Sequence, residues 1–309
     1  MNRRTFLGAA AGVGGLACWN RPGRLAGDRL VERWSWVMGQ PVHITLYAMT
    51  EQHGLDAAAL ALTELRRVEG AISLFDASSD LVALNDRAGT GSHRVGPDLT
   101  ALLVRSEALR QRTAGAFNPA VEPLMRAWGF HASRSSSPTS AELAAAASAV
   151  RQATVRIDAR GIALGHRDTR LDLGGIGVGY GLDRAAAVLR SAGITRALID
   201  ISGDLLAIGS PPGERGWPVE IATMPGVVPS RVVTIADAAL ATSSNRQSVV
   251  RYDGVVTGHI FDPVRGAPAH ALTQVSVVAT TGTEADALST AMMVTGQRVA
   301  GVREIVAVR

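Results

Sequence analysis

A run of glycines constrains this chain more than any other feature. The segment LDLGGIGVGYGLD, residues 171–183, holds five glycines in eight positions. We expect a short strand that ends in these glycines and an apolar helix over residues 181–192 beyond them. Such a junction leaves backbone N–H groups bare at a helix N-terminus, where phosphate binds well. Glycines also permit a tight bend without any ligand, so both interpretations stay open. The segment is not a dinucleotide fingerprint or a P-loop, because G-x-G-x-x-G and a following Lys-Ser/Thr are both absent.

The rest of the chain predicts an α+β fold with a largely antiparallel sheet and flanking helices. Alternating apolar residues between Val31 and Met49 predict two strands that turn at Met38-Gly39. Apolar residues recur at helical spacing over 55–74, 98–114 and near 284–295. The strands predicted after residue 150 mostly follow one another directly, which favours antiparallel pairing.

Composition excludes some classes of partner. The chain is 47% hydrophobic and 19% charged, as expected for a globular core. Aromatic residues make up only 4%, which leaves little surface for stacking single-stranded bases. All 31 basic residues are Arg, scattered among Asp and Glu. We therefore expect no nucleic-acid partner.

The first 26 residues have the pattern of a twin-arginine-type export signal. Arg3 and Arg4 precede a short, mildly apolar, Gly/Ala-rich run that is too short to span a membrane. A chance Arg pair before a buried helix would explain the same pattern. Cys18 is the only cysteine, so no internal disulfide forms. We expect an exported, periplasmic protein with a single domain over residues 31–309, bound to the membrane only if Cys18 is lipidated.

Seven segments, in order, resemble the ApbE family of flavin transferases. LDLGGIGVGYGLD is similar to the family's LDLGGIAKGYAVD, and GAFNPAVEPL is similar to GAFDPTVGPL. The remaining five segments are VMGQPVHITL, SLFDASSDLVALN, ALIDISGDLLAIG, the ATSSN-to-HIFDPVRG stretch and ADALSTAMMVTG. The resemblance spans about residues 31–309 and implies an ApbE-like, T-fold-related architecture.

A magnesium site is the first implication of the resemblance. Asp286 and Thr290 are four residues apart, so in a helix they lie on one face. Carboxylate and hydroxyl oxygens suit Mg²⁺, although an Asp in a first helical turn and a solvent-facing Thr explain the same spacing. The resemblance implies that Asp286, Thr290 and the backbone carbonyl of Gly175 hold the ion.

A flavin site with a catalytic base is the second implication. The resemblance assigns the base to His259, whose ordinary pKa near neutrality suits that role. Asp262 either orients His259 or holds the turn that follows it. The positions that the resemblance assigns to FAD binding are Met38, Phe75, Ala116, Phe117, Asn118, Asp172, Val178 and Ile260. Without the resemblance, four of them would be interpreted as core residues: Met38, Phe75, Phe117 and Ile260.

The implied reaction is Mg²⁺-dependent transfer of FMN from FAD to a Thr or Ser hydroxyl of an acceptor, with release of AMP. The implied acceptor is a flavoprotein subunit of a membrane or exported redox system. Two departures from the family pattern are Val178, where the family has Lys or in some members Glu, and Asn118, where it has Asp. They motivate a second hypothesis, an exported FAD-binding protein that has lost the reaction. A pyrophosphatase that cleaves FAD to FMN and AMP is a third. A fourth hypothesis is an α+β binding module without flavin, which would leave the seven ordered matches to the family unexplained.

Overall fold

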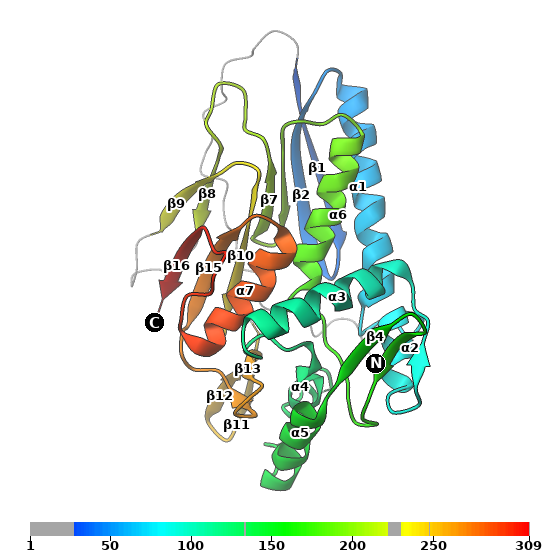
Figure 1. The fold of residues 1–309 in the computed structure, drawn as a ribbon. Helices are drawn as coiled ribbons and strands as arrows, with labels where there is room; N and C mark the ends of the chain where they lie inside the picture. The colour runs from blue at the N-terminus through cyan, green and yellow to red at the C-terminus, as the bar shows by residue number, and fades with distance from the viewer. Residues whose placement is uncertain (1–27, 133, 222–229, 247, 309) are drawn as a thin grey trace.

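A seven-stranded antiparallel sheet forms the centre of the molecule (Figure 1). The structure is a computed structural model that describes residues 28–132, 134–221, 230–246 and 248–308, so the expected export signal and Cys18 lie outside the described residues. Each neighbouring pair in the sheet is antiparallel, which confirms the predicted α+β class. In spatial order the strands are β1 (Arg29–Val37), β2 (Gln40–Ala48), β6 (Ala197–Ile201), β7 (Asp204–Ile208), β10 (Ala238–Ser244), β15 (Gln274–Ala279) and β16 (Glu304–Val308).

The first hairpin turns at the predicted residues. Met38 and Gly39 have φ angles of 55° and 69°, and Val37 pairs with Gln40 on either side of them. Two consecutive positive φ angles match the twist of the flanking strands, so the connection stays tight. The hairpin thereby places the Met38 side chain at the end of the sheet where α6 packs, beside Gly181.

Three helices cover one face of the sheet (Figure 1). They are α1 (Glu51–Ile72), α6 (Gly177–Ser191) and α7 (Gly282–Thr295). Thr50 caps α1 and Thr281 caps α7, each by accepting a backbone N–H from the first turn. Alternate residues of β2 are fully buried beneath these helices, which forms the main core of the molecule.

The opposite face of the sheet carries a smaller core. The hairpin of β8 (Trp217–Ile221) and β9 (Arg231–Ile235) packs there around the buried Trp217. The remaining elements lie at one end of the sheet (Figure 1). The helices among them are α2 (Asp80–Asp86), α3 (Pro97–Arg112), the 3-10 turn η1 (Pro119–Val121), α4 (Glu122–Ala127) and α5 (Ser140–Gln152). The strands among them are β3 (Ser92–His93), β4 (Val155–Asp158), β5 (Gly161–Leu164), β11 (Val249–Tyr252), β12 (Val255–Gly258), β13 (Phe261–Asp262) and β14 (Ala267–Pro268). No helix among the described residues is long and apolar enough to cross a bilayer.

The prediction for the glycine-rich segment is partly wrong. Residues 171–173 form no strand; instead the Asn85 side chain bonds both the N–H and the C=O of Leu171, and Asp172 N–H donates to Pro119 O. A side-chain amide thus takes the place of a neighbouring strand. The helix that follows begins at Gly177 rather than at residue 181, so three of the five glycines are helical.

Candidate functional site

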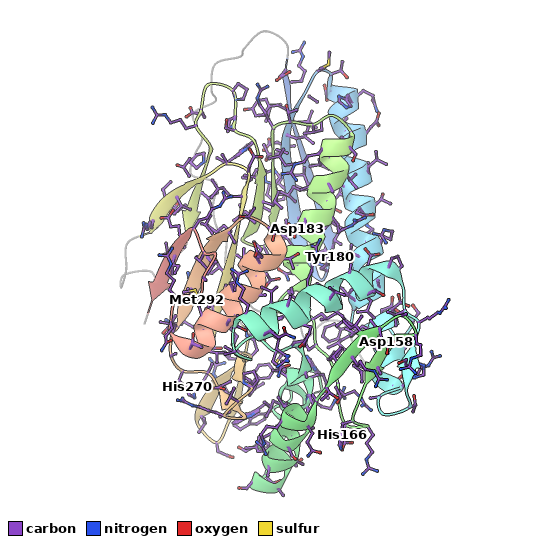
Figure 2. All side chains as sticks on the ribbon, viewed as in Figure 1. Asp158, His166, Tyr180, Asp183, His270 and Met292 are labelled. Carbon is purple, nitrogen blue, oxygen red and sulfur yellow. The ribbon has the colours of Figure 1, made fainter. Side chains whose placement is uncertain are left out.

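The helices α6 and α7 cross in close contact at two glycines. A Cβ on Gly179 would lie 2.1 Å from the carbonyl oxygen of Gly282, and a Cβ on Gly282 would lie 2.4 Å from that of Gly179. Asp183 of α6 then accepts the backbone N–H groups of Gly282 and Thr283 at 2.7 and 3.0 Å. Figure 2 shows Asp183 where α6 meets the start of α7. The glycines therefore allow contact between two helix backbones, and Asp183 sets the register of that contact.

This register brings the three predicted metal-binding residues together. One turn from Asp183 along α6, Gly179 N–H donates to Asp286 Oδ2 at 3.0 Å. About one further turn away, a Cβ on Gly175 would lie 3.0 Å from Thr290 Oγ1. Asp286 and Thr290 lie on one face of α7, as predicted, and both face the glycine-rich segment.

Asp286 lies among buried carboxylates. Its side chain is 6% exposed, and burial together with the charges of Asp204 and Asp183 raises its pKa well above the usual value. Burial also raises the pKa of Asp204 to about 7, with a further contribution from Asp200. Within the described ranges no Arg or His side chain forms an ion pair with Asp204 or Asp286. Buried carboxylates without a countercharge are costly, so a bound cation fits this site.

The donor set at Asp286 suits a hard cation. Across the described part of the chain, no three His, Cys, Asp or Glu side chains are grouped as a metal centre. An ion here would use one carboxylate, the Thr290 hydroxyl and the backbone of Gly175, together with substrate or water oxygens. All of these are oxygen donors, as Mg²⁺ prefers.

Most N–H groups of the glycine-rich segment already have acceptors within the protein. Gly174 donates to Asp172 Oδ1 at 2.7 Å, and Ile176 and Gly177 donate to Leu173 O at 3.2 and 2.7 Å. Gly179 donates to Asp286. The geometry therefore favours helix contact and a bend over phosphate binding as the reason for these glycines.

His259 is partly buried, and its contact with a backbone carbonyl defines its tautomer. Its Nδ1 lies 3.4 Å from Ser248 O, so Nδ1–H donates and Nε2 is left as the acceptor. Burial lowers the pKa of His259, which keeps the ring neutral at pH 7. The ring also contacts Phe130 edge-on, with centroids 6.3 Å apart. The negative charge of Asp172 opposes part of the pKa decrease caused by burial. A neutral imidazole with one free acceptor nitrogen is competent as a general base.

Asp262 serves the turn that follows it. Its Oδ1 accepts the backbone N–H groups of Val264 and Arg265, both at 2.9 Å. The geometry thus matches the turn interpretation of this residue, while orientation of His259 stays a prediction.

The positions predicted to bind FAD differ in their exposure. Phe75 is 82% exposed, and its ring offers an open apolar surface. Ala116, Phe117 and Ile260 are buried in the main core. Asn245 Oδ1 accepts the N–H of Ile260 at 3.2 Å, which ties the segment after His259 to the end of β10.

The polar positions in this set are held locally. Asn118 caps the 3-10 turn through Ala120 N–H and also lines a cavity of about 440 Å³. Asp172 anchors the bend through Gly174. Val178 is partly buried and packs against the main core. Its side chain is apolar, so this position carries no charge.

Sequence patterns do not single out His131 or Glu122, yet both lie at this site. His131 Nε2 lies 3.0 Å from Asp172 Oδ2, and its Nδ1 lies 3.4 Å from Glu122 Oε1. The ring also contacts Phe75 edge-on, with centroids 6.1 Å apart. No spacing rule links residues 122, 131 and 172, because the loop after α4 brings them together.

The fold and the site together define an α+β protein in which Asp286, Thr290 and the Gly175 backbone bring oxygen atoms together, and in which His259 is a partly buried, neutral histidine. The ApbE family model matches residues 38–304, and the chain belongs to the ApbE family. A relative from Treponema pallidum, named FAD:protein FMN transferase, is 31% identical over 87% of this chain and 79% of its own length. A second relative of that name, from Rhodobacter capsulatus, is also 31% identical, and the match covers 95% of this chain and 56% of that protein.

Solved structures agree with this membership. The ApbE protein from Thermotoga maritima superposes with a TM-score of 0.80 at 26% identity, and the match covers 90% of this chain and 94% of that one. The flavin transferase ApbE from Vibrio cholerae has the same fold, with a TM-score of 0.75 at 22% identity over 91% of this chain and 97% of its own.

Proposed function

We propose that this chain is an exported, Mg²⁺-dependent FAD:protein FMN transferase. It would move FMN from FAD to a Thr or Ser hydroxyl of an acceptor redox protein and release AMP. The observation that carries the proposal is the register of α6 against α7, which brings Asp286, Thr290 and Gly175 together beside buried, uncompensated carboxylates. Two relatives named FAD:protein FMN transferase at 31% identity support the same reaction.

The cation site would hold Mg²⁺ through Asp286, Thr290 and the Gly175 carbonyl. A bound ion would neutralise negative charge on the FAD pyrophosphate. The chain contributes the rigidity of this site. Asp183 fixes α7 against α6. Ser243 Oγ of β10 lies 2.7 Å from Ser289 Oγ and 3.4 Å from Thr290 Oγ1, so it holds both hydroxyls in place.

His259 would take the proton from the acceptor hydroxyl. Its Nε2 is the free acceptor because Nδ1–H donates to Ser248 O. As the proton moves to Nε2, the hydroxyl oxygen bonds to the FMN phosphorus and the bond to the AMP phosphate breaks. FMN is then joined to the acceptor through its phosphate, and most of the rate enhancement comes from positioning.

The flavin would bind against the exposed Phe75 ring, and the resemblance assigns Met38 and Ile260 to the same flavin site. Asp172 would accept hydrogen bonds from ribose or base edges of FAD. Water at the acceptor position would give FMN and AMP, so hydrolysis of FAD is the second candidate reaction. It is favoured only if the acceptor hydroxyl is missing.

One assay tests the proposal. The purified chain is incubated with FAD and an acceptor redox domain, with and without Mg²⁺, and covalent flavin is followed by in-gel fluorescence. Labelled acceptor and AMP that both require Mg²⁺ and Asp286 would support the transferase. Tight FAD binding with neither product, for a second acceptor as well, would instead indicate a flavin-binding protein without catalysis.

A further inference from the structure

His131 bridges the buried carboxylate of Glu122 and the largely buried carboxylate of Asp172 at the edge of the candidate flavin site. Its ring nitrogens face Asp172 Oδ2 at 3.0 Å and Glu122 Oε1 at 3.4 Å. The side chains of His131, Glu122 and Asp172 are 10%, 1% and 13% exposed. A neutral imidazole has one N–H and cannot donate to both carboxylates, whereas an imidazolium donates to each. The geometry is therefore that of a charged ring.

The neighbouring charges balance this imidazolium. Arg126 Nε donates to Glu122 Oε1 at 2.7 Å, so two cations face two carboxylates. Burial acts to lower the pKa of His131, but the hydrogen bonds and charges of Asp172 and Glu122 outweigh it and raise the pKa to about 9. His259, the other titratable group near Asp172, is kept neutral by its burial.

Asp172 depends on this cation for its own state. Burial opposes the ionisation of Asp172, and the hydrogen bond from His131 leads the contacts that hold its pKa below the usual value. The other oxygen of the carboxylate accepts Gly174 N–H at 2.7 Å. His131 thus fixes both the charge and the direction of the carboxylate, and its ring contacts the exposed Phe75 on the same side. Val178 adds no charge here, so the countercharge of Asp172 comes from His131.

We infer that His131 is a positioning residue for the flavin nucleotide: as an imidazolium held by Glu122, it keeps Asp172 ionised and aimed to accept hydrogen bonds from FAD. The inference rests on the proposed function, because it concerns the same flavin site. His131 does not touch the reacting phosphorus in the proposed reaction. It acts on FAD affinity, and through it on KM more than on kcat.

The test is FAD affinity as a function of pH, measured by flavin fluorescence on the purified full chain without an acceptor. We expect His131→Gln to raise the Kd for FAD at pH 7 about 10-fold, the effect of one charge-assisted hydrogen bond. The Kd of the unmodified chain should rise between pH 8 and 10, while that of His131→Gln should stay flat there. Glu122→Gln removes one of the two carboxylates that face the His131 ring and leaves Asp172 in place. The pKa of His131 should fall, so FAD affinity should decrease at a lower pH than in the unmodified chain.

His270→Gln serves as the matched control, since His270 is an exposed histidine outside this cluster (Figure 2). Nitrogen NMR of the imidazoles adds a readout that needs neither FAD nor transfer: the signals lost in His131→Gln should show both ring nitrogens protonated at pH 7.5. A neutral His131 at that pH, or unchanged FAD affinity in folded His131→Gln, would overturn the inference and leave the transferase standing. No FAD binding by the unmodified chain would overturn both.

Discussion

The substitution Gly179→Ala tests why the glycine-rich segment has no side chain at this position. In an open helix this change gains about 1 kcal/mol, because Ala restricts the unfolded chain. At Gly179 the new methyl would lie 2.1 Å from Gly282 O and 2.8 Å from Asp286 Cβ, whereas ordinary contact begins near 3.4 Å. The helix α7 must therefore move away by roughly 1 Å in a close-packed interior.

The expected loss follows from two terms. Overpacking of this kind costs about 1–3 kcal/mol. Weakening the hydrogen bond from Gly179 to the Asp286 carboxylate adds about 1.5–3 kcal/mol. After the helix-propensity gain of about 1 kcal/mol is subtracted, we expect a net loss of roughly 1.5–5 kcal/mol. At roughly 2–4 °C per kcal/mol for a domain of this size, Tm falls by roughly 3–20 °C.

The assay is urea unfolding with a matched control. Gly70→Ala places the same methyl in the helix α1, where nothing lies within 4 Å, and should raise stability by about 0.5–1 kcal/mol. Gly179→Ala should also weaken the stabilisation by Mg²⁺, because Asp286 moves with α7. If Gly179→Ala proves as stable as Gly70→Ala, the close contact between α6 and α7 is not the reason for the glycines.

Three side chains of the site allow further tests. Because burial raises the pKa of Asp286, its ionisation destabilises the metal-free fold as pH rises above 3.8; Asp286→Asn should therefore raise Tm in EDTA and abolish the Tm increase caused by Mg²⁺. The lowered pKa of His259 places the acid limb of the transfer rate below pH 6.5, and His259→Asn should lose at least about 100-fold in rate with little change in FAD affinity, as steady-state kinetics and fluorescence would check. Phe75→Ala should leave Tm within about 1 °C, since the ring is exposed, yet weaken FAD binding; a large Tm loss would mean that Phe75 is a core residue.

The sequence predicted the parts of the fold that depend on local pattern. The Met38-Gly39 turn follows from residues that tolerate positive φ between alternating strands. The shared face of Asp286 and Thr290 follows from helical spacing alone. Both depend on neighbours in the chain, where periodicity carries the information.

The rest of the site depends on contacts between distant segments. Leu171–Leu173 resembled a strand, but the Asn85 side chain, 86 residues away in the chain, takes the place of a strand partner. His131 lies in a loop, and the carboxylates of Glu122 and Asp172 stabilise its protonated ring. Only folding brings these two residues to His131. Likewise, the contact of Gly179 with Gly282 depends on the crossing of two helices, which no pattern within either helix determines.

The central claim is that a cation held at Asp286 and Thr290 enables FMN transfer from FAD. The most direct measurement is covalent labelling of an acceptor redox domain by the purified chain, with Mg²⁺ or EDTA, for the unmodified protein and Asp286→Asn. We expect fluorescent acceptor and one AMP per label only for the unmodified chain with Mg²⁺. Equal labelling in EDTA, or by Asp286→Asn, would contradict the claim.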